Sequence, residues 1–138
     1  MSTSPECIFC KIINKEIPAH IIYEDEKYLT FLDISPISPG HALVIPKNHS
    51  PDLLHANSSD RSGLLEIVAK VAPRILRAVG ASAFNIGINT GKDSGQIVFH
   101  THVHIIPRKP NDGMKSWGNI SSKADDLDKI AQKIRDNL

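Results

Sequence analysis

The chain has 138 residues, of which 41% are hydrophobic, and its 16 basic and 15 acidic side chains nearly cancel. A chain of this length and composition can close a hydrophobic core as one ordinary domain. Because the basic residues are scattered, the sequence lacks the charge footprint of a nucleic-acid binder and that of a protein that binds anionic membranes. We therefore expect a small-molecule partner, with no nucleic acid and no membrane.

The amino-terminal segment, residues 1–18, has no basic region followed by an apolar region, so it does not look like a secretory signal peptide. No apolar run approaches the roughly 20 residues needed to span a bilayer. We expect a cytoplasmic protein. In that reducing compartment, the pair Cys7 and Cys10 in "CIFC" is interpreted as metal ligands or as a redox pair rather than as a structural disulfide.

The first part of the chain has the pattern of an antiparallel β-meander. Short runs rich in β-branched and aromatic residues are separated by acidic, proline or glycine residues, such as those in "DISPISPG". The predicted strands cover residues 20–25, 27–33 and 41–47.

A long helix is predicted over residues 61–80, with Gly80 as its C-cap and a kink at Pro73. Its polar residues form one narrow stripe, so most of its circumference is apolar. One apolar line contains Leu64, Val68, Val71, Ile75 and Val79, and another contains Leu65, Ala72 and Leu76. Because one sheet cannot cover both lines, we expect one side to pack on the sheet and the other on a second copy, in a homodimer.

Two more strands, over residues 83–89 and 97–106, flank the loop "TGKDSGQ" and precede a final amphipathic helix. That helix has Ser122 as a candidate N-cap and an apolar face made of Leu127, Ile130, Ala131 and Ile134. The sequence has no internal repeat, no low-complexity segment and no long linker. The expected fold is α+β, with about five strands and two main helices in a single domain over residues 1–138.

Three histidines occupy every second position of the last predicted strand, in "HTHVH". Side chains alternate between the faces of a strand, so His100, His102 and His104 would share one face at a spacing of about 6.6 Å. A single histidine on an apolar strand is most often a hydrogen-bonded core residue. Three in register would require three buried polar groups to be satisfied, which favours a chemical role.

Two chemical uses fit such a triplet. Alternating histidines can hold a catalytic zinc that keeps an open position for water. Alternatively, one imidazole can attack phosphorus while its neighbours donate to the phosphate and to the leaving group. The preceding loop contains Gly91, Ser94 and Gly95 and can turn backbone N–H groups towards an anion. Since such clusters are mostly simple turns, the loop alone does not decide between the two uses.

The motif "HTHVHII" resembles the His-φ-His-φ-His-φ-φ signature of the histidine triad (HIT) superfamily, in which φ is apolar, with Thr101 as a departure. Residues 7–49 and 84–108 also resemble that family, in the expected order. The chain looks most like the Hint-type branch, in the bacterial form with an N-terminal Cys pair. Galactose-1-phosphate uridylyltransferases are less similar, because they have Gln where His104 stands. The resemblance implies a HIT fold with a five-stranded antiparallel sheet.

By this resemblance, His102 attacks the α-phosphorus of a nucleotide ester or phosphoramidate and forms a nucleotidyl-histidine intermediate that water hydrolyses. His104 would hold the phosphate and assist the leaving group. An ordinary imidazole pKa of about 6.5 leaves a useful neutral fraction at physiological pH. The substrate-binding positions implied near the phosphate and the leaving group are Asn89, Gly95, Gln96, Ile97 and Val98. Many relatives have Ser or Thr where Ile97 stands, so this chain lacks that donor to the leaving group.

The nucleoside side of the implied site is the segment "TFLDISP". Asp33 offers two acceptor oxygens for a ribose diol, and by analogy with the family Phe31, Leu32 and Ile34 would sandwich a purine. Without the resemblance, Asp33 is equally well interpreted as an Asx-turn residue and its apolar neighbours as core.

The expected function is hydrolysis of a purine nucleoside phosphoramidate or a related nucleotidyl conjugate through His102. No metal or other cofactor is needed for that chemistry. Among enzymes, the alternative is a dinucleoside polyphosphate hydrolase. From a different class, the protein would be a nucleotide-binding interaction module in which catalysis is incidental. The resemblance also implies a homodimer.

The Cys pair supplies two of the four ligands of a structural zinc site. HIT proteins with this pair place a zinc ion between it and two histidines, and the matching positions here are His49 and His100. The resemblance therefore implies a structural zinc bound by Cys7, Cys10, His49 and His100. The alternative is a pair of reduced thiols on a short helix.

Overall fold

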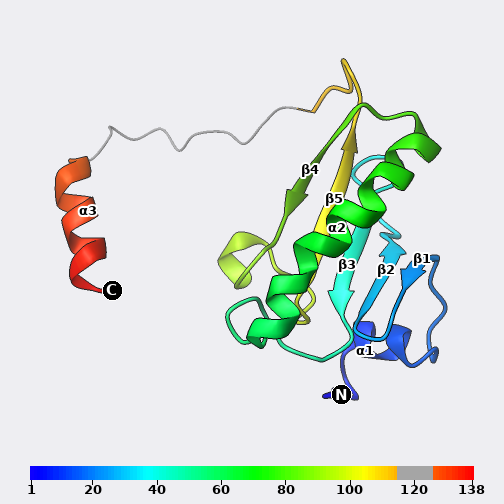
Figure 1. The fold of residues 1–138 in the computed structure, drawn as a ribbon, viewed down its shortest axis with the longest axis horizontal. Helices are drawn as coiled ribbons and strands as arrows, with labels where there is room; N and C mark the ends of the chain where they lie inside the picture. The colour runs from blue at the N-terminus through cyan, green and yellow to red at the C-terminus, as the bar shows by residue number, and fades with distance from the viewer. Residues whose placement is uncertain (115–125) are drawn as a thin grey trace.

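The computed structural model describes residues 1–114 and 126–138 and has an α+β fold built on one five-stranded sheet (Figure 1). The strands are β1 (Ile21–Glu24), β2 (Tyr28–Leu32), β3 (Ala42–Pro46), β4 (Ala83–Gly87) and β5 (Val103–Arg108). They lie in the order β1-β2-β3-β5-β4, and every neighbouring pair is antiparallel. The predicted fold class and the five-stranded antiparallel sheet are confirmed.

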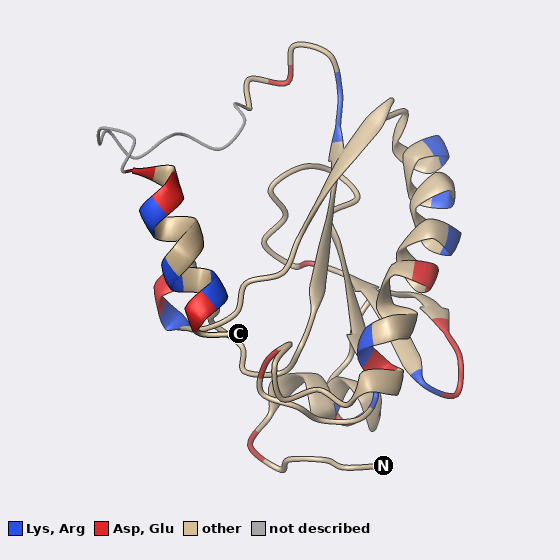
Figure 2. Ribbon diagram, turned by 60° about the vertical axis from the view of Figure 1, so that its left-hand side comes forward, with Lys and Arg blue, Asp and Glu red and all other residues tan. Residues whose placement is uncertain are grey.

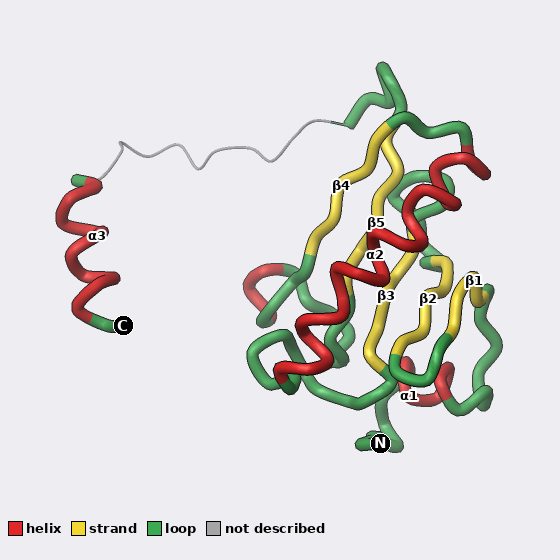
Figure 3. The backbone as a smooth tube through the Cα atoms, viewed as in Figure 1, coloured by secondary structure: helices red, strands yellow, loops and turns green. Residues whose placement is uncertain are grey.

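The helices are α1 (Ile8–Ile13), α2 (Ser58–Val79) and α3 (Leu127–Asp136), and a short 3-10 turn, η1, covers Lys92–Ser94. Figures 1 and 3 show α2 running across one face of the sheet. The two main helices of the sequence are present as α2 and α3, and the Cys pair lies at the start of the shorter α1. In the described parts of the chain, no helix is long and apolar enough to cross a membrane.

Two hydrophobic clusters cover the two faces of the sheet. The cluster under α2 consists of Tyr28, Ala42, Val44, Leu64, Ile67, Val68, Val71, Ala72, Ile75, Val103 and Ile105. The cluster on the opposite face joins α1 to β2 and β3 and consists of Phe9, Ile12, Leu29, Phe31, Leu43 and Ile45. Because alternate residues of a strand enter alternate clusters, the central strands β2 and β3 are buried between two apolar layers and their position is fixed from both sides.

The helix α2 begins at Ser58, where the Asn57 side chain accepts a hydrogen bond from the amide of Asp60 at 2.8 Å as an N-cap. It continues through Pro73 and ends at Val79, and the next residue, Gly80, has a φ of 69° and forms the predicted left-handed C-cap. Figure 2 shows charged residues along the side of α2 that faces away from the sheet. This is the polar stripe that the sequence predicts.

The apolar line of α2 that begins at Leu64 packs on the sheet, as expected. In the second line, Leu65 remains 57% exposed, but the prediction that Ala72 belongs there is wrong. Ala72 is fully buried against the sheet, because it follows Val68 by four residues and therefore shares its face.

The strand predicted over residues 97–106 begins only at Val103, so the prediction is wrong for residues 97–102. Figure 3 shows the chain before β5 as loop. The neighbouring strand β3 ends at Pro46, which has no amide hydrogen to extend the ladder. The amide of Thr101 instead donates to the carbonyl of Ser50 at 2.9 Å, and their hydroxyls lie 2.7 Å apart. His100 and His102 therefore lie on an extended segment outside the sheet ladder.

The helix α3 has Asp126 as its N-cap and none of its residues is buried. Leu127, Ile130 and Ile134 are exposed on its apolar face. The predicted N-cap, Ser122, lies outside the described residues.

Candidate functional site

His102 and His104 form a pair at the beginning of β5. Val103 and Ile105 enter the cluster under α2, so His104 points to the opposite face of the sheet. The ring centroids of His102 and His104 are 4.9 Å apart, with the rings tilted at 68°. The structure thus brings together the two residues that were predicted to perform catalysis.

The ring of His102 is oriented by a single strong hydrogen bond. Its Nδ1 atom lies 2.6 Å from the carbonyl oxygen of His100, and because a carbonyl can only accept, Nδ1 carries the proton. A neutral ring then has its lone pair on Nε2. The Phe9 and His102 rings pack in an edge-to-face arrangement, with centroids 5.2 Å apart and an interplanar angle of 87°. Burial lowers the pKa of His102, so the neutral, nucleophilic form is favoured.

His104 is also held neutral. Burial, followed by the proximity of His102 and His41, lowers its pKa to about 4. Its Nδ1 atom lies 2.9 Å from Nε2 of His41, a residue in the loop before β3. His41 is itself only 2% exposed.

Asp33 lies beside these histidines, immediately after β2. Its Oδ1 atom accepts a hydrogen bond from the amide of Ser35 at 2.8 Å, so the Asx-turn interpretation of this residue also holds. Its Oδ2 atom is 3.7 Å from Nε2 of His41. The carboxylate is therefore fixed in orientation near the predicted catalytic pair.

The apolar residues around Asp33 do not share one face. Phe31 is buried and packs edge-on against Phe9 at 5.4 Å, in the cluster that also borders the histidines. Leu32 packs with the cluster under α2, because it follows Phe31 on the strand and points to the other side. Ile34 is 90% exposed. The structure therefore brings Phe31 and Asp33 to the histidines, leaves Ile34 open to solvent, and does not bring Leu32 to this site.

The loop before β5 is shaped by glycines and by a buried glutamine. Gly91 and Gly95 have φ values of 90° and 97°, which L side chains rarely adopt. The side chain of Gln96 is buried; it accepts from the amide of Gly91 and donates to the carbonyls of Pro51 and Val98. Gln96 thus positions the backbone around it, because its own amide group is committed to internal hydrogen bonds.

The remaining loop positions differ in exposure. Ile97 is 88% exposed, whereas Val98 packs partly against the cluster around Phe9. Asn89 is partly buried, and a side chain added at Gly95 would come within 3.6 Å of its Nδ2 atom. The glycine therefore leaves the Asn89 amide uncovered on that side.

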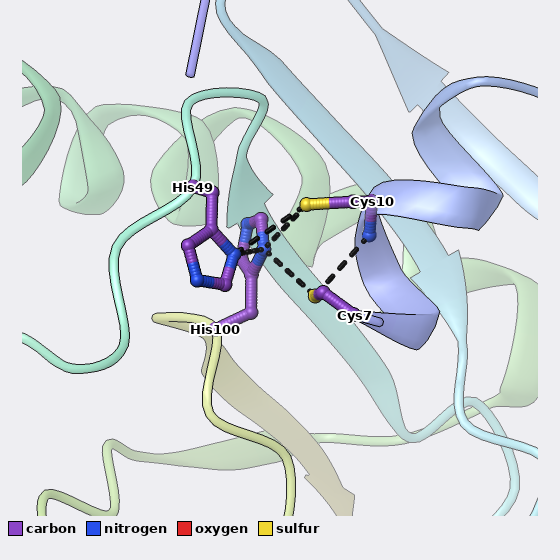
Figure 4. A group of neighbouring side chains, drawn as sticks. All are labelled: Cys7, Cys10, His49 and His100. Atoms are coloured by element: carbon purple, nitrogen blue, oxygen red, sulfur yellow. Dashed lines mark hydrogen bonds between the residues drawn. The ribbon is translucent and has the colours of Figure 1, made fainter. Parts of the chain in front are cut away.

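Cys7, Cys10, His49 and His100 converge into one cluster from three parts of the chain (Figure 4). The cysteines come from the beginning of α1, His49 from the loop after β3, and His100 from the segment before β5. Nδ1 of His100 lies 3.4 Å from Sγ of Cys7 and 3.6 Å from Sγ of Cys10, and Nδ1 of His49 lies 3.4 Å from the Cys10 sulfur.

This cluster fits a tetrahedral zinc ion. Zinc–sulfur and zinc–nitrogen bonds of about 2.3 and 2.0 Å place a sulfur and a nitrogen ligand about 3.5 Å apart, and two nitrogens about 3.3 Å apart. The two Nδ1 atoms of His49 and His100 are 3.2 Å apart. Nε2 of His100 donates to the carbonyl of Pro46 at 2.7 Å, which leaves its Nδ1 lone pair directed at the cluster. Burial raises the pKa of the Cys10 thiol, which disfavours a thiolate redox pair unless a cation is bound.

Two residues of the site were not predicted from the sequence. Phe9 reaches the histidines because α1 packs across the sheet, and nothing local in its sequence indicates that contact. His41 begins the run that forms β3, two positions before Leu43, the partner of His104 in the ladder. That two-residue spacing could have indicated a shared face, had the register been known.

The chain was compared with known proteins. A family model described as the HIT domain matches residues 14–111. Adenylylsulfatase HINT3 from Arabidopsis thaliana is 40% identical over 129 residues, which cover 94% of this chain and 66% of the plant protein.

Solved structures give the same result. A zinc-bound histidine triad family protein from Mycobacterium smegmatis superposes with a TM-score of 0.77 at 38% identity, covering 86% of this chain and 85% of the other. A histidine triad nucleotide-binding protein from Candida albicans gives a TM-score of 0.82 at 34% identity, covering 96% and 97%. The family model, the identities and the shared fold together establish that this chain belongs to the HIT family.

Proposed function

We propose that this protein is a nucleotide-binding hydrolase that cleaves a purine nucleoside phosphoramidate, or a related nucleotidyl conjugate, through a covalent intermediate on His102. The single observation that carries the proposal is the hydrogen bond from His102 Nδ1 to the carbonyl of His100 at 2.6 Å. That bond directs the remaining lone pair, on Nε2, away from the backbone and makes the ring available as a nucleophile.

In the proposed first step, Nε2 of His102 forms a bond to the α-phosphorus, and the bond from phosphorus to the leaving group breaks. The leaving amine takes up one proton from solvent water as its bond to phosphorus breaks. In the second step water attacks the same phosphorus, the N–P bond to His102 breaks, one proton of the attacking water returns to solvent, and a nucleoside monophosphate is released. His104 holds the phosphate and assists the leaving group, because it lies beside His102 with a ring separation of 4.9 Å.

The nucleoside would be held by the segment after β2. Asp33 supplies a carboxylate for the ribose diol, and the exposed Ile34 supplies apolar surface for the purine. Phe31 would support the purine site from within the buried cluster around Phe9. The backbone of residues 95–98 would contact the phosphate, with Asn89 near the leaving group. Support for the nucleotide ligand comes from the relatives, one named as a nucleotide-binding protein and another as an adenylylsulfatase.

A substrate panel tests this proposal. Adenosine and guanosine phosphoramidates and a dinucleoside polyphosphate should be compared on one purified sample, with the His102→Asn variant as control. We expect the phosphoramidates to be cleaved fastest and the variant to bind AMP but not to turn over. Preferential cleavage of the dinucleotide would favour the alternative hydrolase. Tight nucleotide binding without turnover of any substrate would favour the interaction module.

The Cys/His cluster is proposed to hold a structural zinc ion that takes no part in the chemistry. Its four ligand atoms lie within 4.8 Å of one another, and the relative from Mycobacterium smegmatis is described as zinc-bound. Bound there, zinc would connect α1 to the loop after β3 and to the segment before β5. Metal analysis should give about one zinc per chain, and Cys10→Ala should lose both metal and thermal stability. Unchanged stability in a metal-free Cys10→Ala variant would contradict this proposal.

A homodimer is proposed as the assembly. β4 lies at the edge of the sheet, and its Phe84 and Ile86 side chains are 38% and 37% exposed. An edge strand with exposed apolar side chains is a surface that another chain can cover. Leu65, from the second apolar line of α2, adds to the exposed apolar surface.

A further inference from the structure

A chain of hydrogen bonds links the loop after β2 to the ring of His104. The amide of Ile37 donates to Nδ1 of His41 at 3.0 Å, and Nε2 of His41 lies 2.9 Å from Nδ1 of His104. The loop itself is fixed at several points. The hydroxyl of Ser38 donates to the carbonyl of Pro107 at 2.7 Å, and the amide of His41 donates to the carbonyl of Ser38 at 3.0 Å.

The direction of the first hydrogen bond determines that of the second. A backbone amide can only donate, so Nδ1 of His41 must be the acceptor and carries no proton. A neutral ring then carries its proton on Nε2, which faces His104. If the neutral His104 ring were protonated on Nδ1, two N–H groups would face each other at 2.9 Å. His104 is therefore the acceptor, and its own proton lies on Nε2.

A hydrogen bond explains the contact between His41 and His104 better than a shared metal ion does. Asp33, His41 and His104 have ligand atoms within 4.8 Å of one another, which by itself resembles a metal-binding group. However, the 2.9 Å between the two ring nitrogens is shorter than the roughly 3.3 Å between nitrogens on a tetrahedral ion, and it is the length of a hydrogen bond. The Asp33 oxygen, 3.7 Å from His41, is too far away to compete for the proton.

We propose that His41 is a positioning residue that sets the tautomer of His104, so that His104 presents an Nε2–H donor next to the Nε2 lone pair of His102. The Ile37 amide determines the tautomer of both rings, because it donates to Nδ1 of His41. Resting on the proposed function, the consequence is that His104 donates its Nε2 hydrogen bond to the leaving group or phosphate, while His102 attacks. His102 and His104 have the same side chain but opposite roles. His102 donates from Nδ1 to a carbonyl and keeps a lone pair on Nε2, whereas His104 accepts at Nδ1 from an N–H group and keeps a proton on Nε2.

The tautomer is measured without any turnover. Long-range proton–nitrogen correlation spectra of the protein with ¹⁵N-labelled histidine distinguish ring nitrogens that carry a proton from those that carry a lone pair. At neutral pH we expect both His41 and His104 to be protonated on Nε2 only, and the His104 Nδ1 signal to move in His41→Gln and His41→Leu. A proton on Nδ1 of neutral His104 would overturn the assignment, whatever the protein hydrolyses.

Kinetic measurements on two substrates test how the His104 tautomer affects departure of the leaving group. In an adenosine phosphoramidate with an alkylamine leaving group, the leaving nitrogen needs a hydrogen-bond donor as its bond to phosphorus breaks, whereas in an adenylate ester of an acidic phenol the leaving oxygen does not. We expect His41→Leu to slow the phosphoramidate by about tenfold or more and the phenyl ester by less than about twofold. His41→Gln, which retains an N–H donor, should recover most of the phosphoramidate rate. The matched control is His55→Leu, since the His55 side chain is exposed and, among the residues that the structure describes, it bonds to Asp52 alone.

The outcomes separate this proposal from the proposed function. An equal loss on both substrates in His41→Leu would show a merely structural role and overturn the positioning role. Failure of the unmodified protein to cleave either substrate would instead contradict the proposed hydrolase, and the spectra would still decide the tautomer.

Discussion

Four histidines around β3 and β5, namely His41, His100, His102 and His104, each use at least one ring nitrogen in an internal hydrogen bond. His41 accepts from an amide, His100 and His102 each donate to a carbonyl, and His104 pairs with His41. The bond fixes the orientation of each ring and determines which nitrogen is left for function. In His100 the remaining nitrogen faces the cysteines, and in His102 it is the proposed nucleophile.

The burial of His104 predicts how the free energy of unfolding depends on pH. The pKa of His104 is lowered to about 4, so below pH 6.5 the unfolded chain takes up a proton that the folded protein does not. The free energy of unfolding should therefore fall as the pH is lowered from about 6.5 to about 4. Thermal melts at several pH values measure this. A His104→Gln variant should show a smaller loss over the same window, and an identical pH dependence would contradict the assignment.

At the scale of the elements, the packing of α2 on β2 depends on a glycine. Gly63 lies on α2 where a β-carbon would overlap the hydroxyl of Tyr28, which donates to the carbonyl of Asp60 at 2.8 Å. Gly to Ala in a helix ordinarily stabilises by about 1 kcal/mol. Here we expect Gly63→Ala to destabilise by about 1–3 kcal/mol, because the helix must move away from the sheet.

Chemical denaturation of Gly63→Ala measures this effect, and the Tyr28→Phe background is its control. Removing the hydroxyl should reduce the penalty of Gly63→Ala, because the overlap is largest with that oxygen. A Gly63→Ala variant more stable than the unmodified protein would contradict the packing described here.

The elements also show where sequence reasoning succeeds and where it fails. The alternating runs and the cap at Gly80 are local signals, so the sheet strands and the end of α2 could be predicted from them. The beginning of β5 could not, because it depends on Pro46 ending β3 and on Ser50 bonding the amide of Thr101, both distant in sequence. The prediction for Ala72 was wrong because Ala72 follows Val68 by four residues and so lies on the helix face that packs on the sheet.

In the site, as in the elements, local features could be predicted from the sequence and features that depend on distant residues could not. The triplet of histidines and the Cys pair are visible in the sequence, and the structure brings them into two groups that meet at the segment 100–102. The role of Leu32 could not be predicted, because the register of β2 places it under α2. His41 and Phe9 reach the site only through tertiary packing.

At the scale of the whole molecule, the proposed dimer depends on the β4 edge. Phe84→Glu combined with Ile86→Glu places charge on two side chains that are more than a third exposed, so it should leave the fold intact and separate the subunits. Light scattering at micromolar concentration should report a dimer for the unmodified protein and a monomer for the variant. Leu54→Glu, at a 76% exposed position in the loop between β3 and α2, is the control. A monomeric unmodified protein would contradict the proposed assembly.

The central claim is that His102 carries the nucleotidyl group. The direct measurement is a single-turnover reaction with an adenosine phosphoramidate, quenched early and analysed by intact mass and peptide mapping. We predict a mass increase of one adenylyl group, located on His102, and no such adduct in His102→Asn, which keeps the shape of the side chain but offers no nucleophilic nitrogen. An adduct on another residue, or near-normal turnover by His102→Asn, would contradict the mechanism.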